Sequence, residues 1–161
     1  MIRLIAAIDR KGGIAKHGYQ PWYIPEDEAY FTKQTKSHGG NVLTGGTTFR
    51  DSYKGNPLVG RTNYLLTRNI QPIEGVLLVH DLKEWLATIG NQDIWVAGGA
   101  SLFQQVIDAG KADELYITHI DADFGCDQFF PDYQAKFRLI SQSGQLAQNG
   151  FNFSYARYAR D

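Results

Sequence analysis

Short apolar runs along the chain alternate between the spacing of buried strands and the spacing of amphipathic helices. The first run, Ile2–Ile8, is apolar except for one charge, which is typical of a strand covered on both faces. Further strand-like runs are Asn41–Thr44, Asn63–Thr67, Gly75–Val79, the segment DIWVA, Glu114–Ile120 and Phe151–Tyr158. In the last run aromatic side chains alternate with other residues, which predicts a strand with one aromatic face.

Helix-like segments lie between these strands. Pro25 suits the first turn of a helix that runs to about Lys36. TTFRDSY and ASLFQQVI follow two further strands, and Asp81 starts a helix with Glu84 three residues later, as in a capping box. This order predicts one α/β domain over residues 1–161, with a mostly parallel sheet and an antiparallel C-terminal end. Ser143–Gly150 is interpreted as a hairpin loop.

Two predicted strands end in a glycine pair that is followed by a helix with hydroxyl residues in its first turn. These segments are Val42–Phe49 and Trp95–Phe103. Each pair taken singly is more often only a tight turn, and neither matches a P-loop or the G-x-G-x-x-G fingerprint. Because α/β sheets bind ligands at the carboxyl ends of their strands, two such turns together favour a diphosphate site. Arg68 follows a third strand, and it is either an ordinary surface arginine or a contact for an additional phosphate.

Three consecutive acids, Glu26, Asp27 and Glu28, begin the first predicted helix. All three favour the positive end of the helix dipole, which explains Glu26 by itself. At about 100° per residue, Asp27 falls inside the aromatic stripe centred near Phe31, and Glu28 lies at the edge of that stripe. No lysine or arginine shares this face within one turn, and an inward carboxylate without a partner is costly. Asp27 is therefore predicted to meet a ligand with a cationic or donor-rich edge.

Composition excludes several function classes. The net charge of −1 over 161 residues argues against a nucleic-acid binder, and no apolar run approaches the length of a membrane span. Cys126 is the only cysteine, so no intrachain disulfide can form, and a reducing cytoplasm is the simplest location. We interpret Cys126 as a loop thiol rather than a nucleophile, because no histidine is near it in sequence. The four histidines are scattered without ligand spacing, so no metal site is predicted.

Over essentially its whole length the sequence resembles the dihydrofolate reductases of the bacterial chromosomal type. The matching segments are LIAAID, the G-I-x-x-x-G-x-x-P-W loop, IPEDEAYF, VLTGGTTF, PLVGRTNYLLTR, VAGGASLF, LYITHID and GCDQFFPDY. The resemblance implies an eight-stranded, mostly parallel twisted sheet with an antiparallel C-terminal strand and about four flanking helices. It also implies NADPH-dependent reduction of 7,8-dihydrofolate to 5,6,7,8-tetrahydrofolate, by hydride transfer to pterin C6 and protonation at N5. That reaction belongs to one-carbon metabolism and is the target of antifolates.

The resemblance also implies residue roles on the substrate side. Asp27 would accept hydrogen bonds from the 2-amino group and N3 of the pterin, Trp22 would hold a nearby water, and Thr118 would be hydrogen-bonded to Asp27. Arg61 would pair through its planar fork with the carboxylate of the glutamate tail. The catalytic group would be Asp27, Trp22 and Thr118, and the substrate-binding group would be Ile5, Ala7, Asp27, Glu28, Phe31, Tyr53 or a neighbour, Leu58, Arg61 and Thr118.

On the cofactor side, the resemblance implies that NADPH lies across the sheet crevice with its phosphates on the two glycine turns. Thr67 and Arg68 would meet the 2′-phosphate. The loop from Asp9 to Trp22 would be a lid over the nicotinamide, tethered by Asp127. The implied cofactor-binding residues are Ala7, Ile14, Gly18, Gln20, Gly45, Gly46, Thr47, Thr48, Leu66, Thr67, Arg68, Ala97, Gly98, Gly99, Ala100, Ser101, Leu102 and Phe103.

Four positions depart from the family pattern. Gly46 stands where many members carry an arginine on the cofactor phosphates, which leaves more of that task to Arg68. Glu28 replaces an apolar residue of the substrate pocket and would compete with the substrate tail for the pocket arginine. Gln20 replaces an apolar lid residue, and Phe103 replaces a tyrosine near the nicotinamide. Together these departures predict altered affinity or inhibitor response with activity retained.

Two alternatives stay open at this stage. The first is another NADPH-dependent pterin or pyrimidine reductase of the same fold, which would share the glycine turns but lack the P-W-x-x-P-x-D segment. The second is a non-catalytic NADPH-binding relative, against which the presence of Asp27, Trp22, Thr118 and Arg61 argues. A monomer is expected, with dihydrofolate as its small-molecule partner and neither nucleic acid nor membrane.

Overall fold

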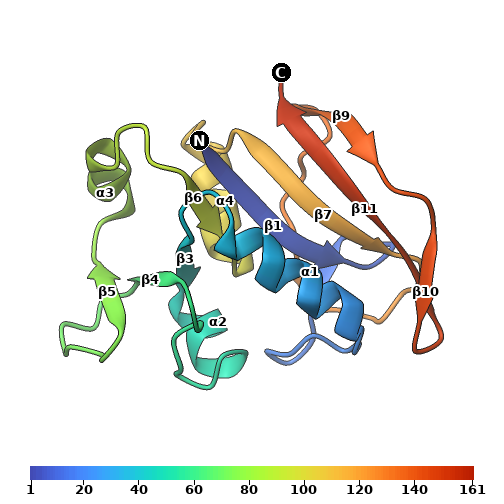
Figure 1. Ribbon diagram of the computed structural model, residues 1–161, viewed down its shortest axis with the longest axis horizontal. Coiled ribbons are helices and arrows are strands. Elements are labelled where there is room, and N and C mark those ends of the chain that lie inside the picture. The colour runs from blue at the N-terminus through green and yellow to red at the C-terminus, as the bar shows by residue number, and fades with distance from the viewer.

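A twisted sheet forms the centre of the computed structural model, which describes residues 1–161 (Figure 1). Its strand order is β10-β11-β7-β1-β6-β3-β4-β5, and a ninth strand, β9, pairs with the other part of β11. The path from β7 to β5 is parallel, whereas β11 runs antiparallel to β7, β9 and β10. The strands are β1 (Ile2–Ile8), β3 (Asn41–Gly45), β4 (Thr62–Leu66), β5 (Val76–Val79), β6 (Ile94–Val96), β7 (Glu114–Ile120), β9 (Phe137–Gln142), β10 (Leu146–Gln148) and β11 (Phe151–Arg160).

Four helices flank this sheet, namely α1 (Pro25–Lys36), α2 (Gly46–Asp51), α3 (Leu82–Thr88) and α4 (Ala100–Asp108). Successive residues of a strand point to opposite faces. Accordingly, Leu4 joins the core cluster that holds the apolar residues of α4, whereas Ile5 joins the cluster that receives Tyr30 and Phe31 of α1. The two helices therefore cover opposite faces, and Figure 1 shows α1 in front of the sheet. None of the four helices has the length and apolar composition that crossing a membrane requires.

The predicted α/β fold is confirmed, and three predicted elements have the expected bounds: Ile2–Ile8, Pro25–Lys36 and Glu114–Ile120. The predicted cap of α3 is also present, because the Asp81 carboxylate accepts the Glu84 N–H at 2.9 Å. The helix after the second strand is shorter than TTFRDSY and begins one residue earlier, at Gly46.

Four strands were not predicted. β2 (Gly13–Ala15) and β8 (Gln128–Phe129) are very short and pair only with each other, so neither has an apolar pattern. In β9 only the first residue is buried, which removes the alternation that marks a strand. β10 lies inside Ser143–Gly150, so part of the predicted loop is in fact an arm of the hairpin with β11.

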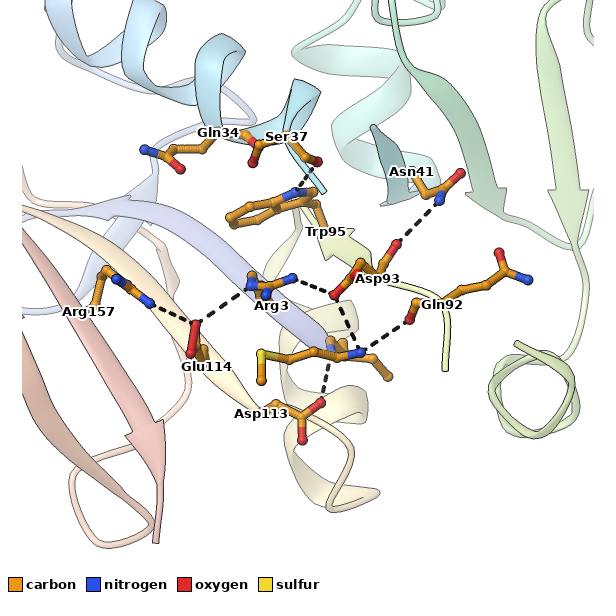
Figure 2. Close-up of polar contacts among 12 residues, drawn as sticks. Arg3, Gln34, Ser37, Asn41, Gln92, Asp93, Trp95, Asp113, Glu114 and Arg157 are labelled. Atoms are coloured by element: carbon orange, nitrogen blue, oxygen red, sulfur yellow. Dashed lines mark hydrogen bonds and ion pairs between the residues drawn. The ribbon is translucent and has the colours of Figure 1, made fainter. Parts of the chain in front are cut away.

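A polar network holds the amino ends of β1, β6 and β7 together (Figure 2). Arg3 Nη1 donates to Asp93 Oδ1 at 2.8 Å, and Glu114 Oε2 lies 3.6 Å from Arg3 Nε and 3.3 Å from Arg157 Nη2. In the same view Trp95 Nε1 donates to the carbonyl of Ser37, the residue that ends α1, at 3.2 Å. This bond fixes the end of α1 against β6, so the first turn of the helix is held over the opposite, carboxyl end of the sheet.

Candidate active site

A cavity of about 960 Å³ opens at the carboxyl ends of the parallel strands, between α1, α2, the start of α4 and the loop before α1. This volume lies at the upper end of the range of small-molecule and cofactor sites. Every predicted catalytic and substrate residue lines it: Ile5, Ala7, Trp22, Asp27, Glu28, Phe31, Tyr53, Leu58, Arg61 and Thr118. A second cavity, of about 710 Å³, contains none of the predicted site residues.

Asp27 points into this cavity, as its helical phase predicts. Thr118 Oγ1 donates to Asp27 Oδ1 at 2.6 Å, and Thr118 itself stands opposite Ala7 on the neighbouring strand. Burial raises the pKa of Asp27 to about 6, the hydrogen bond from Thr118 opposes this rise, and the charge of Glu28 adds to it. Glu26 and Glu28 are exposed. A half-buried carboxylate with a raised pKa and no basic partner in a cavity is typical of a functional site.

Aromatic and apolar side chains surround Asp27. Ile5, Trp95 and Tyr116 form one buried cluster, against which Phe31 packs. Trp22 is buried beside Ala7, and its Nε1 has no hydrogen-bond partner in the protein. A buried donor without a partner is costly, so this N–H is available to a ligand or a water in the cavity.

Arg61 stands at another part of the cavity wall. Its Nη1 donates to Thr35 Oγ1 at 3.0 Å and its Nε donates to the carbonyl of Val59 at 3.0 Å. Arg61 forms no ion pair with Glu28 or any other carboxylate; its partners are Val59 and Thr35. Burial lowers the pKa of Arg61, while burial raises the pKa of nearby Tyr53 to about 12, and both groups keep their ordinary charge near neutral pH. The guanidinium is therefore held in place with donors free for an anion.

The two glycine turns meet in one part of the cavity wall. The N–H of Gly45 donates to the carbonyl of Gly98 at 2.7 Å. A Cβ on Gly45 would lie 3.4 Å from that carbonyl oxygen, and a Cβ on Gly99 would lie 3.1 Å from Thr48 Oγ1. Neither α2 nor α4 has a side-chain cap at its N-terminus. The backbone N–H groups at this junction are thus free for an anionic ligand.

Of the eighteen predicted cofactor-binding residues, sixteen line the same cavity as the glycine turns and two do not. Leu66 lines the cavity, but the two residues that follow it, Thr67 and Arg68, do not. Arg68 is exposed. The residues inside the wall are Ala7, Ile14, Gly18, Gln20, Gly45, Gly46, Thr47, Thr48, Leu66, Ala97, Gly98, Gly99, Ala100, Ser101, Leu102 and Phe103.

Comparison with known proteins agrees with this geometry. Residues 1–160 match the family model of dihydrofolate reductase. The chain belongs to the dihydrofolate reductase family. It is 30% identical to the dihydrofolate reductase of Buchnera aphidicola, with 99% of each chain covered, and 32% identical to that of Bacillus subtilis, with 99% of this chain and 95% of the relative covered. A solved dihydrofolate reductase from Enterococcus faecalis, complexed with NADP(H) and RAB-propyl, superposes with a TM-score of 0.87 at 30% identity, covering 100% of this chain and 96% of that one.

The loop before α1 is anchored at its base by Asp9, which sequence reasoning did not select. Its buried carboxylate accepts the N–H groups of Lys11 at 2.9 Å and Gly13 at 2.8 Å through Oδ1, and that of Phe124 at 3.2 Å through Oδ2. Burial and a hydrogen bond to Asp9 raise the pKa of Cys126 to about 11. The thiol therefore stays protonated, as expected for a loop thiol and not for a nucleophile.

Further along, the loop is held on both sides of the cavity. β2 pairs with β8, and Asp127 Oδ2 accepts the N–H of His17 at 3.1 Å, where the resemblance places the tether. On the far side the ammonium of Lys54 lies 4.6 Å from the ring centroid of Tyr19 and 3.3 Å from its hydroxyl. Tyr19 was not among the predicted site residues, because an exposed aromatic in a glycine-rich loop gives no periodic signal.

We expect Asp9→Ala to destabilise the protein by about 2–4 kcal/mol, because three backbone donors lose a buried charged acceptor. For a chain of this size the melting temperature should fall by about 5–10 °C in thermal unfolding followed by circular dichroism. Asp9→Asn keeps one oxygen acceptor and should lose less. Asp132→Ala, at an exposed position, is the control. If Asp9→Ala has the same melting temperature as this control, the anchoring role is contradicted.

Proposed function

We propose that this chain reduces 7,8-dihydrofolate to 5,6,7,8-tetrahydrofolate with NADPH, using Asp27 as its substrate-orienting acid. The observation that carries the assignment of roles is the half-buried Asp27 carboxylate, bonded to Thr118 in the cavity that also contains the two glycine turns. Membership of the dihydrofolate reductase family supports the reaction. One chain builds the whole cavity, which supports a monomer. The single cysteine supports a cytoplasmic location, and the net charge of −1 argues against a nucleic-acid partner.

The residues at the glycine junction fit a dinucleotide. Side chains at Gly45 and Gly99 would crowd the junction, whereas their absence lets the backbone approach a diphosphate closely. Thr47, Thr48 and Ser101 add hydroxyl donors on the same wall. Bound NADPH supplies the hydride for pterin C6, and the protein supplies position and electrostatic field.

Asp27 orients the pterin. Its carboxylate accepts hydrogen bonds from the 2-amino group and N3, and Thr118 fixes the rotamer in which it does so. Because Asp27 lies at the far edge of the pterin from N5, it favours the protonated substrate through its charge, and the proton reaches N5 through water. The unpartnered Nε1 of Trp22 holds that water.

Arg61 binds the other end of the substrate. Thr35 and Val59 hold its guanidinium, which leaves free donors for the carboxylate of the glutamate tail. Glu28 lies on the same wall with its charge exposed, so it weakens the binding of an anionic tail without blocking it. The loop from Asp9 to Trp22, part of which lines the cavity, would cover the bound ligands and exclude bulk water.

We expect Asp27→Asn to lower kcat/KM at pH 7 by at least about 100-fold, because the amide neither carries the charge nor accepts both substrate hydrogen bonds. Activity should recover as the pH falls, since the substrate then arrives protonated. The assay is loss of NADPH absorbance with dihydrofolate. Glu28→Gln is the matched control one residue on, and it should retain activity; equal losses in both variants would mean that Asp27 is not the orienting acid.

We expect Arg68→Ala to raise the KM for NADPH by roughly 10- to 100-fold, because it removes a charge-assisted contact with the 2′-phosphate. NADH lacks this phosphate, so its KM should not change. Steady-state kinetics measure the KM values for NADPH and NADH in the wild type and in the variant. If both values rise together, Arg68 contacts a part of the nucleotide that the two cofactors share.

A further inference from the structure

The tip of the loop before α1, residues 16–19, is a tight two-residue turn. The N–H of Lys16 donates to the carbonyl of Tyr19 at 2.8 Å, and the N–H of Tyr19 donates to the carbonyl of Lys16 at 3.1 Å. Between them, His17 and Gly18 have positive φ angles of 51° and 85°, as in the I′ turns of hairpins. This turn fixes the direction in which the Tyr19 side chain leaves the loop.

The loop tip packs against the end of α2 and the segment that follows it. A Cβ on Gly18 would lie 3.0 Å from Asp51 Oδ2, so a side chain there would push the tip and this carboxylate apart. Beside this contact, the ammonium of Lys54 lies 4.6 Å from the ring centroid of Tyr19 and 3.3 Å from its hydroxyl oxygen. An ammonium at this distance is attracted by the negative face of the ring. Two contacts therefore join the loop tip to the end of α2.

Backbone hydrogen bonds hold Lys54 in place for this contact. The N–H of Tyr53 donates to the carbonyl of Thr48 at 3.1 Å, and the N–H of Gly55 donates to the carbonyl of Phe49 at 2.9 Å. Both acceptors belong to α2, so the helix carries Lys54 from both sides. Lys54 itself has a φ of 56°, the left-handed conformation found after many helices. Because the contact joins two preformed segments, little backbone entropy is lost when it forms.

The Lys54 ammonium is not engaged in an ion pair that would compete with Tyr19. Asp51, three residues earlier, is paired with Arg50, whose Nε lies 2.8 Å from Asp51 Oδ1. The polar contact of the Lys54 side chain is the one with the Tyr19 hydroxyl. Tyr19 and Lys54 are therefore matched to each other.

The contact between Tyr19 and Lys54 lies where the cavity opens to solvent. Tyr19 lines the cavity and is 52% exposed, residues 51–53 line it from the side of α2, and Lys54 is exposed outside the wall. The contact thus bridges two walls at the rim. Asp9 and Asp127 hold other parts of the loop, so this bridge is what joins its tip to the opposite wall.

We propose that the Tyr19–Lys54 contact is a strap across the cavity rim, and that its opening sets the rates at which the cofactor enters and leaves. The strap opens for entry and for exit, and it closes in the same way over the empty and the filled cavity. Breaking it therefore raises both rate constants and leaves their ratio, the Kd, nearly unchanged. A residue that touches the cofactor would instead change the Kd, chiefly through dissociation. The proposal rests on the proposed function, because it takes NADPH as the ligand.

The test is stopped-flow kinetics of NADPH binding to the full chain, followed by protein fluorescence, with dissociation measured by displacement with excess NADP⁺. Lys54→Met removes the charge and keeps an unbranched side chain, and Tyr19→Leu removes the ring. Each should raise both rate constants by about two- to fivefold, the effect of losing one exposed cation–π contact, and change the Kd by less than about twofold. The double variant should match the single variants, because either change alone breaks the strap.

Lys16→Met is the matched control. Lys16 is exposed on the same loop tip, but its ammonium lies toward Gly125, 3.9 Å from where a Cβ on that glycine would be. Loss of one cation weakens the attraction of an anionic cofactor in Lys16→Met and Lys54→Met alike, so the comparison isolates the strap. Lys16→Met should raise neither rate constant. Thermal unfolding checks that each variant is folded.

Hydrogen–deuterium exchange in the ligand-free protein tests the strap without the cofactor. The amides of residues 13–19 should exchange faster in Lys54→Met, whose substitution lies outside that segment. Unchanged exchange overturns the strap, and so does a Kd that rises together with the dissociation rate constant, which would make the pair a cofactor contact. If the wild type binds no NADPH, the proposed function fails and the claim about cofactor rates with it, while exchange still decides whether Lys54 holds the loop tip.

Discussion

The hydrogen bond between Thr118 and Asp27 joins the carboxyl end of β7 to the first turn of α1. A carboxylate in that position loses solvation, and its pKa rises to about 6 as a result. Nothing in the protein neutralises it, since no basic side chain pairs with Asp27. Its ionised form is therefore destabilised in the empty cavity and stabilised by a ligand with donors or positive charge. In the proposed function, substrate recognition depends on this unbalanced charge.

The parallel sheet brings the rest of the site to the same place. The order β7-β1-β6-β3 places Thr118, Ala7, Ala97 and Gly45 at neighbouring strand ends. A bond from Gly45 to the carbonyl of Gly98 then locks the two glycine turns together. The loop before α1 is anchored by buried Asp9, which directly follows β1 and so ties this loop to the same sheet. The residues that line the cavity and the loop before α1 thus share one support, the parallel sheet.

Helical phase and strand order were sufficient to predict much of this arrangement. The inward direction of Asp27 follows from the position of Phe31 on the same helix, and the pairing of the glycine turns follows from their place after parallel strands. The bond from Thr118 to Asp27 came from the resemblance to the family, and the bond from Arg61 to Thr35 was not predicted, because both partners are distant in sequence and have no periodic signal of their own. Asp9 and Tyr19 were missed for a related reason: their contacts are with loops, which local patterns do not describe.

The central claim is that Asp27 is a desolvated acid held by Thr118, and its titration tests this most directly. Carbon-13 NMR of the side-chain carboxyls in the ligand-free protein should show one aspartate that titrates near pH 6. This resonance should be absent in Asp27→Asn and should titrate at still higher pH in Thr118→Val, because the hydrogen bond that favours the ionised form is lost. The account is contradicted if Asp27 titrates near pH 4, as an exposed aspartate does, and if its pKa is unchanged in Thr118→Val.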